Sequence, residues 1–132
     1  MIEEEKRIAL INYRIQQSTE TLKDAELLIN SESYRSAVNR IYYAVFYTLL
    51  ALGLKYKFET SKHSHLIGWF NKNFIYQKLI PVELGKIVKR IFDCRTSGDY
   101  DEFVIFEKQE VTMLYENSKL FLSEIKKFIE KE

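Results

Sequence analysis

The sequence contains very few residues that break helices or crosslink the chain. Of its 132 residues, one is proline, four are glycine and one is cysteine. The single cysteine, Cys94, excludes an intrachain disulfide framework, and this fits a reducing cytoplasm. So few helix-breaking residues favour long helices with short connections. No strand-like alternation of apolar and polar residues persists anywhere, which argues against a sheet.

Several motifs that carry chemistry are also missing. The chain has no glycine-rich phosphate loop and no nucleophile elbow of the serine-hydrolase type. Its two histidines, His63 and His65, stand two positions apart, so on a helix they point about 200° apart and do not chelate one ion. No cysteine lies near them to complete a zinc site. The sequence therefore predicts neither a metal nor a cofactor.

Signals for export or membrane insertion are absent as well. The first residues, MIEEEKR, are acidic where a signal peptide would be basic and then apolar. The longest apolar-rich run, residues 41–54, is shorter than the roughly 20 residues that a membrane-spanning helix needs. We therefore expect a cytoplasmic protein with no membrane partner.

The sequence does contain apolar residues at regular, helix-like spacings. Apolar residues recur at spacings of three and four over residues 3–30, 33–53, 81–97 and 108–129, and a shorter segment covers residues 60–74. Residues 33–53 are apolar on nearly all sides, which predicts a central helix. Ser33 and the pair Thr60–Ser61 are expected to cap helix starts, Pro81 to lie in a first turn, and Gly53 to follow a helix end.

These segments predict the fold class. Four longer helices and one short helix, joined by brief connections, are typical of an all-α, antiparallel four-helix bundle (up-down-up-down) with an additional short helix. We expect a single domain over residues 1–132, because no linker or change in composition divides the chain. Residues 98–106 are expected to form a loop before the last helix.

Charge is unevenly distributed along the chain. The net charge is +1 overall, made up of −1 over residues 1–52, +6 over residues 53–95 and −4 over residues 96–132. A basic middle segment is compatible with a surface that binds an acidic ligand, and equally with a mixed, solvated surface. Charge alone does not choose between them.

Arg95 is the most unusual residue of the pattern. It stands three positions after Phe92 and four after Ile91, and so continues the apolar stripe of its helix. A guanidinium facing a core is costly unless it is paired or reaches a solvated cleft. One interpretation is that Arg95 pairs with Asp99 to lock a turn. The other is that it points into a groove and binds phosphate, because the planar guanidinium can donate two hydrogen bonds to a phosphate at once.

Two further residues have the same two-sided interpretation. Arg40 interrupts the most apolar segment beside Tyr42 and Tyr43. It either belongs to a solvent-facing strip or lines the same cleft as Arg95, with tyrosine hydroxyls contributing hydrogen bonds. His63 lies at an expected helix start. There it either helps the backbone N–H groups to bind an anion or is an ordinary surface residue. Arg95, Arg40, His63, Asp99, Tyr100 and Tyr43 are therefore the candidate ligand-binding residues.

Three stretches of the chain together resemble a known family. They are Tyr34-Arg-Ser-Ala-Val-Asn-Arg-Ile-Tyr-Tyr-Ala-Val-Phe46, then Lys62-His-Ser64 leading to Phe70 and Phe74, then Arg95-Thr-Ser-Gly-Asp-Tyr-Asp101. In order and spacing they resemble the HEPN domain (higher eukaryotes and prokaryotes nucleotide-binding), in its small uncharacterised prokaryotic branch. The resemblance implies a bundle of four or five helices that forms a homodimer. It also implies a minimal nucleotidyltransferase as partner, in a toxin–antitoxin pair.

Many active members of that family are metal-independent ribonucleases with an Arg followed, after four to six residues, by a His. The resemblance implies that Arg95 is this arginine and contacts phosphate. The corresponding later positions hold Tyr100, Asp101 and Glu102, so the histidine is missing. An imidazole is the group best suited to acid–base chemistry near neutral pH, and nuclease activity therefore does not carry over intact.

Three hypotheses follow. The first is a nucleotide- or RNA-binding module whose site includes Arg95. The second is a ribonuclease with a substituted base, for which Arg95, His63 and Tyr100 are the candidate catalytic residues. The third is a non-catalytic interaction protein in which Arg95 and Asp99 form only a structural pair.

Overall fold

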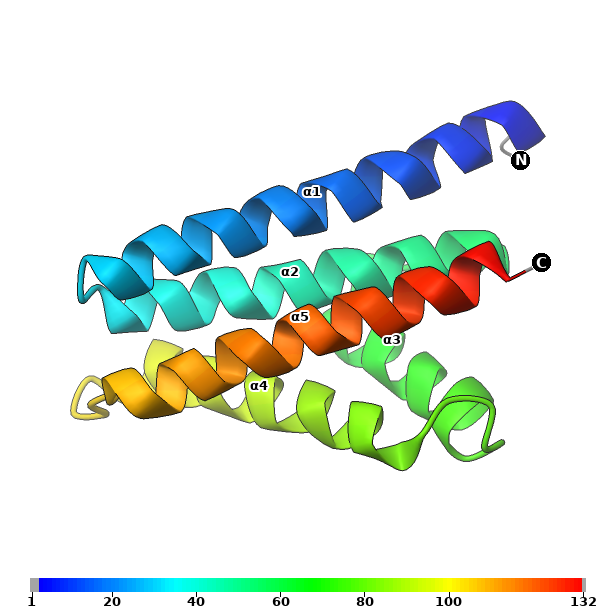
Figure 1. Ribbon diagram of the computed structural model, residues 1–132. Coiled ribbons are helices and arrows are strands. Elements are labelled where there is room, and N and C mark those ends of the chain that lie inside the picture. Colours follow the sequence, from blue (N-terminus) through cyan, green and yellow to red (C-terminus); the bar gives the residue numbers. More distant parts are fainter. Residues whose placement is uncertain (1–2, 132) are drawn as a thin grey trace.

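The computed structural model describes residues 3–131, apart from the side chain of Tyr100. Its four long helices are α1 (Glu4–Asn30), α2 (Tyr34–Lys55), α4 (Val82–Tyr100) and α5 (Lys108–Glu130). Between α2 and α4 lies the short α3 (His63–Phe70), which continues into a π-helical turn, η1 (Asn71–Ile75). Successive long helices run in opposite directions, with α3 set across them (Figure 1). The predicted all-α, up-down-up-down bundle with an additional short helix is confirmed.

Helix α2 is the centre of the bundle, as its apolar sequence predicts. It packs against α1, α3, α4 and α5. By length and composition α2 is apolar enough to cross a membrane, but 72% of its most apolar window is buried against the other helices. That burial is what the core helix of a bundle shows. The large side chains buried on α2 are Val38, Ile41, Tyr42, Val45, Phe46, Leu49, Leu52 and Leu54.

Helix α1 packs along α2, except at Ile8, through the stripe that the sequence spacing predicts, which consists of Ile8, Ile11, Ile15, Ser18, Leu22, Ala25 and Ile29. Ile8 is 49% exposed, near the start of α1, where this helix diverges from α2 (Figure 1). The polar residue of the stripe, Ser18, is fully buried. Its hydroxyl lies 2.6 Å from the carbonyl oxygen of Ala44 and 2.7 Å from the hydroxyl of Thr48. A buried hydroxyl needs such partners, so these contacts fix the register of α1 on α2.

Several helix boundaries differ from the sequence expectation. Gly53 does not follow the end of α2 but lies inside it, because α2 continues to Lys55. A side chain at Gly53 would place its Cβ 2.8 Å from the carbonyl oxygen of Phe58, so a close backbone approach explains this glycine. The Thr60–Ser61 pair does not cap α3, which begins at His63. Pro81 occupies the position before the first turn of α4.

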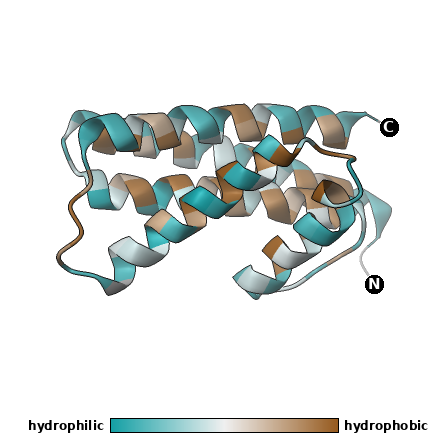
Figure 2. Cartoon of the chain, turned by 90° about the horizontal axis from the view of Figure 1, so that it is seen from below, coloured by the Kyte–Doolittle hydropathy of each residue, from teal (hydrophilic) through white to brown (hydrophobic). Residues whose placement is uncertain are grey.

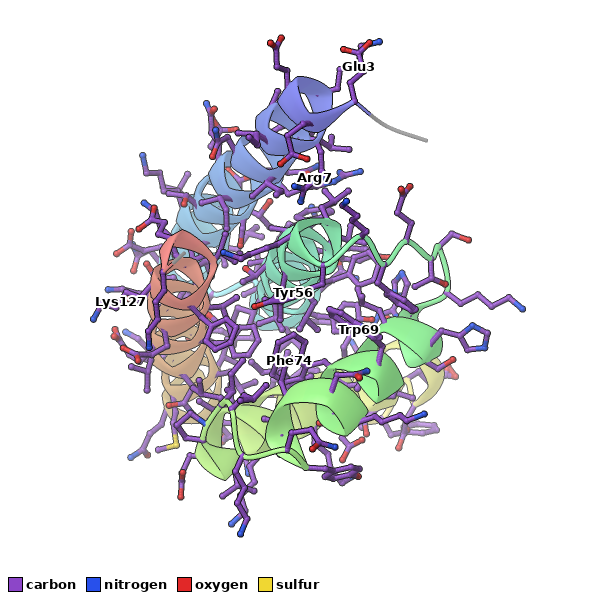
Figure 3. All side chains as sticks on the ribbon, turned by 90° about the vertical axis from the view of Figure 1, so that its right-hand side faces the viewer. Glu3, Arg7, Tyr56, Trp69, Phe74 and Lys127 are labelled. Carbon is purple, nitrogen blue, oxygen red and sulfur yellow. The ribbon has the colours of Figure 1, made fainter. Side chains whose placement is uncertain are left out.

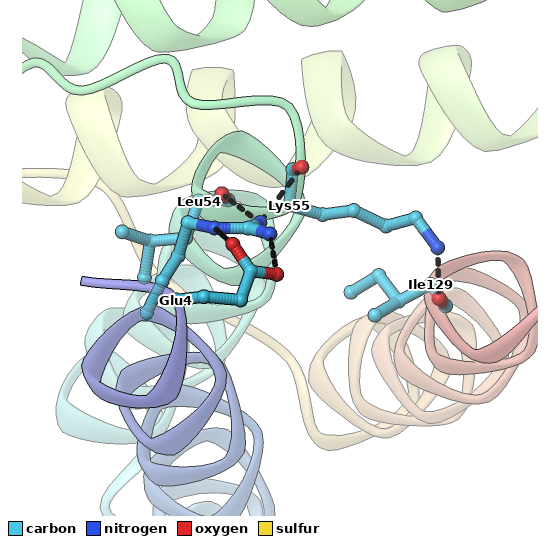
Figure 4. A network of polar contacts seen from close by, with 5 residues as sticks. Glu4, Leu54, Lys55 and Ile129 are labelled. Atoms are coloured by element: carbon cyan, nitrogen blue, oxygen red, sulfur yellow. Dashed lines mark hydrogen bonds and ion pairs between the residues drawn. The ribbon is translucent and has the colours of Figure 1, made fainter. Parts of the chain in front are cut away.

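Polar contacts hold the chain together where α2 ends (Figure 4). Arg7 of α1 donates hydrogen bonds of 3.0 Å to the carbonyl oxygens of Leu54 and Lys55. The Lys55 ammonium donates to the carbonyl oxygen of Ile129 near the end of α5. Carbonyl groups at helix C-termini lack helical partners and carry partial negative charge, so both cations stabilise these ends.

Aromatic rings fill the space between α2, α3 and η1. The ring of Phe58 stacks on that of Trp69 at 4.7 Å, and Phe74 packs edge-on against Trp69 at 5.1 Å and Tyr56 at 5.3 Å. Figure 3 shows Tyr56, Trp69 and Phe74 around this interior space. Aromatic pairs at these distances and angles stabilise a core beyond the area they bury. They hold α3, and therefore its first residue His63, against α2.

Candidate functional site

Helix α4 presents Arg95 at the end of its buried stripe. Leu84, Val88 and Ile91 are buried, and Arg95 follows one turn later with 23% of its side chain exposed. The sequence expectation that Arg95 continues a core-facing stripe is therefore confirmed. Its guanidinium stays close enough to the surface to meet a ligand.

The end of α4 lies later than the sequence predicts. The expected loop starts after Ser97, but the helix continues through Gly98 and Asp99 to Tyr100. Gly98 keeps helical geometry there, and a Cβ on it would lie 3.0 Å from the buried ring of Phe106. This extra turn places Asp99 directly above Arg95 on one helix face.

Arg95 and Asp99 form the ion pair expected under the structural hypothesis. Arg95 Nε lies 2.8 Å from Asp99 Oδ2. The N–H bond of Nε does not point at this oxygen, so the contact is an ion pair without a hydrogen bond. Among the residues described, Nε has no hydrogen-bond partner. The pair orients the guanidinium by charge while leaving part of its donor capacity unused.

Two tyrosines of α2 form the surface on which the guanidinium lies. The central carbon of the Arg95 guanidinium is 4.8 Å from the ring centroid of Tyr42 and 5.6 Å from that of Tyr43. The guanidinium of Arg40 is 5.1 Å from the same Tyr43 ring. Cations are attracted to aromatic faces at these distances. The structure therefore brings Arg40 and Arg95 to one ring.

His63, the first residue of α3, completes the cluster. Its Nδ1 lies 2.5 Å from the hydroxyl oxygen of Tyr42, and its ring centroid lies 3.9 Å from that of Phe46, with the two planes tilted by 32°. Tyr42 thus contacts His63 through its hydroxyl and Arg95 through its ring. We call Arg40, Tyr42, Tyr43, His63 and Arg95 the α2 cluster, to which Asp99 is joined by its ion pair.

The α2 cluster changes the proton affinity of two of its members. Burial, and then the charge of Arg95, lower the pKa of His63 from its ordinary value. The imidazole is therefore neutral near pH 7. Burial raises the pKa of Tyr42 to about 12, against the opposing effect of Arg95. The phenol consequently stays protonated at every physiological pH.

The charge of the site suits anions. It contains two guanidiniums, those of Arg40 and Arg95, and one carboxylate, that of Asp99, which pairs with Arg95. Among the residues that the structure describes, no three His, Cys, Asp or Glu side chains gather to hold a metal ion. Planar guanidiniums favour carboxylates and phosphates, which they contact through two donors at once.

Two residues of this region, Tyr42 and Arg35, were not among the candidate site residues. Tyr42 looked like an ordinary core residue because it continues the apolar stripe of α2, and its burial confirms that part. Arg35 stands in the stretch that carries the family resemblance, but nothing in its spacing marks it as a contact. Tyr100 was expected in the site, and its side chain lies outside the part of the chain that the structure describes.

Arg35, at the start of α2, binds the end of α4 and the following loop. Its guanidinium donates to the carbonyl oxygen of Gly98 and, at 2.8 Å, to that of Val104. It also lies 5.9 Å from the ring of Phe106. Phe106 is buried and Val104 is half-buried, whereas the other residues of this largely apolar loop are exposed (Figure 2). Arg35 thereby fixes the turn of α4 that carries Asp99.

Comparison with known proteins gives the same identification for almost the whole chain. The family model of the HEPN domain matches residues 11–128. A UPF0332 protein of Thermotoga maritima is 42% identical over 130 residues, which cover 98% of this chain and 96% of that protein. A protein of Methanocaldococcus jannaschii described as a "putative toxin" is 35% identical, with 87% and 78% of the two chains covered.

A second "putative toxin" of Methanocaldococcus jannaschii is 31% identical over 113 residues, covering 86% of this chain and 84% of its own length. These matches extend over all five helices, and the fold they imply is the bundle described above. The chain belongs to the HEPN domain family.

Proposed function

We propose that this protein is a nucleotide- or RNA-binding HEPN module in which Arg95 contacts a phosphate group. The observation that carries the proposal is the approach of two guanidiniums, those of Arg95 and Arg40, to the ring of Tyr43. Two like charges beside one ring repel each other, and the negative charge of a bound phosphate lowers that repulsion. His63 stands on the neighbouring ring and lines the same site.

The ion pair with Asp99 is compatible with this role. It engages Nε of Arg95 and leaves the two terminal nitrogens of the fork for a ligand. A partly exposed ion pair contributes only about 0–1 kcal/mol, so phosphate does not have to displace a strong contact. Asp99 instead keeps the guanidinium in one orientation before the ligand binds.

Binding of labelled single-stranded RNA and of AMP tests the proposal. Arg95→Ala is expected to weaken binding of both at least tenfold, the effect of losing one charge-assisted phosphate contact. Arg90→Ala is the matched control, because Arg90 is on the same helix but exposed and paired with Glu110. Equal affinities for wild type and Arg95→Ala exclude Arg95 as the phosphate contact.

We propose in addition that the protein is cytoplasmic and homodimeric, and that it acts in a toxin–antitoxin-type pair with a minimal nucleotidyltransferase. Its family and the names of its relatives support this. Expression of the chain alone and together with a nucleotidyltransferase encoded beside it is the test. Growth arrest by the chain, relieved by the second protein, is expected. Normal growth in both cases contradicts the toxin role.

Metal-independent ribonuclease activity is a second candidate function, favoured by the position of His63. If Nδ1 carries the proton and donates it to Tyr42, Nε2 is free to take the proton of an RNA 2′-hydroxyl. The 2′-oxygen then attacks the adjacent phosphorus, and the 5′-oxygen leaves and is protonated by water. The products are a 2′,3′-cyclic phosphate and a 5′-hydroxyl end.

Incubation of the pure protein with labelled RNA in EDTA tests this second function. Cleavage is expected to disappear in both His63→Gln and Arg95→Ala. His65→Gln is the matched control, because His65 is the exposed histidine of the same helix. Cleavage that survives in His63→Gln assigns the base to another residue, and no cleavage by wild type removes the candidate.

A further inference from the structure

The α2 cluster lies at one end of a longer half-exposed stripe. Although α2 is buried on most sides, Ser36, Arg40, Tyr43, Tyr47 and Leu50 are only partly buried or exposed, at spacings of three and four. Residues at these spacings share one helix face. From Arg40 to Leu50 this face is about 15 Å long at 1.5 Å per residue, which exceeds the length of one nucleotide.

The stripe has the composition of a single-strand binding surface. Tyr43 is covered by the two guanidiniums, and the next ring along the stripe is Tyr47, 5.9 Å from Tyr43 between centroids. No cation stacks on Tyr47 among the described residues. Aromatic rings that alternate with cations bind single strands, because bases stack on the rings while phosphates contact the cations.

A hollow of about 360 Å³ lies beyond Tyr47, where α1 and the loop after α2 flank the stripe. This volume is within the range of roughly 300–1,000 Å³ that ligand sites occupy. Leu50, Phe58 and Ser61 line it, and Arg14 of α1 brings a guanidinium to it. Glu59 also lines the hollow and is its opposing charge.

We propose that the ligand site extends along this stripe, with Tyr47 stacking a base and Arg14 contacting the phosphate of a further nucleotide. The inference rests on the proposed function, since it takes Arg95 as the first phosphate contact. The site then favours an oligonucleotide strand over a mononucleotide, and the preference arises from residues of α1 and α2 alone. The Arg14 guanidinium already donates a hydrogen bond of 2.9 Å to the side-chain oxygen of Gln17, and this contact holds the guanidinium on this side of α1.

The experiment compares 5′-AMP with a 5′-phosphorylated pentamer of 2′-O-methyl adenosine, which resists cleavage at its 2′-positions. Tyr47→Leu keeps an apolar side chain but removes the ring, and is expected to weaken pentamer binding about tenfold while leaving AMP binding unchanged. Tyr47→Phe is expected to restore wild-type affinity. Tyr76→Leu, at an exposed tyrosine after η1, is the matched control.

Salt dependence tests Arg14 separately. Arg14→Ala is expected to lower the slope of log affinity against log salt for the pentamer by about 0.7, the loss of one phosphate contact on a single strand. Glu59→Gln is expected to raise pentamer affinity, because it removes the opposing charge. Lys126→Ala, on the exposed side of α5, is expected to leave the slope unchanged.

The outcomes separate this inference from the function on which it rests. If Arg95→Ala weakens AMP and pentamer alike, but Tyr47→Leu and Arg14→Ala alter neither, the extended site is wrong and the phosphate site stands. If Tyr47→Leu changes only the oligomeric state in sedimentation, the stripe is a protein interface and the inference is overturned. If Arg95→Ala alters nothing, both fail.

Discussion

Arg95 lies with its guanidinium 4.8 Å from the ring centroid of Tyr42, whose hydroxyl contacts His63. One buried tyrosine of the central helix therefore links a cation of α4 to the imidazole of α3. Because Tyr42 is 2% exposed and fixed in the core, it sets the position of both groups. The functional groups come from three helices, and the central helix holds them together.

The first prediction concerns the pH dependence of stability. Burial and Arg95 lower the pKa of His63 in the folded protein, so the unfolded chain takes up this proton first as the pH falls below about 6.5. The part of the unfolding free energy due to His63 is therefore complete above that pH and is lost as the pH falls through the folded-state pKa. Urea unfolding at pH 8 and pH 5.5 should show a smaller loss in His63→Gln than in wild type.

His65→Gln is the control for this measurement, since it removes an exposed histidine of the same helix. The loss of stability between the two pH values should remain in that variant. An equal loss in wild type and His63→Gln would contradict the environment described for His63.

The second prediction concerns Arg35, which binds the end of α4 to the loop before α5. Arg35→Ala removes two hydrogen bonds to carbonyl oxygens and a cation at a helix C-terminus. We expect a loss of about 1 kcal/mol in unfolding free energy, and faster amide exchange over residues 97–106. Lys126→Ala should change stability by less than about 0.5 kcal/mol. Unchanged exchange in Arg35→Ala would show that other contacts hold this turn.

Sequence periodicity was sufficient to predict the helices, because each buries a stripe that repeats every three to four residues. It was weaker at their ends. α4 extends past Gly98 because Phe106, Arg35 and the helix meet there, and those contacts join residues far apart in the chain. Local signals such as Ser-Gly-Asp describe the chain before it packs, so they do not include this effect.

The third prediction follows from two glycines that look alike in the sequence. Both Gly53 and Gly68 lie inside helices, where alanine is intrinsically favoured by roughly 1 kcal/mol. A Cβ at Gly68 meets nothing within 4 Å, so Gly68→Ala should raise the unfolding free energy by about 0.5–1 kcal/mol. At Gly53 the Cβ would lie 2.8 Å from a backbone oxygen, and Gly53→Ala should lower it by about 1–3 kcal/mol.

Thermal or urea unfolding of the two variants measures these effects in opposite directions. Each variant is the control for the other, because the substitution is the same and only the surroundings of the glycine differ. A stabilised Gly53→Ala would mean that the chain after α2 moves away easily and that the approach of Phe58 is not required.

The site was harder to predict than the fold. Arg95, Arg40, Tyr43, His63 and Asp99 were expected near one another, and the structure brings them together. Arg95 was recognisable because a charge on an apolar stripe needs an explanation. Tyr42 was noted only as a neighbour of Arg40, because a tyrosine on such a stripe needs no explanation, and only the packing of α3 and α4 shows that it contacts His63 and Arg95. Whether these residues bind a ligand remains a prediction.

The central claim is that Arg95 binds phosphate, and the salt dependence of RNA binding tests it most directly. Affinity for a labelled single strand is measured from low to moderate salt for wild type, Arg95→Ala and Arg90→Ala. We predict that Arg95→Ala lowers both the affinity and the slope of log affinity against log salt, the slope by about 0.7. Arg90→Ala should match wild type. Equal affinities and equal slopes in all three proteins would contradict the account.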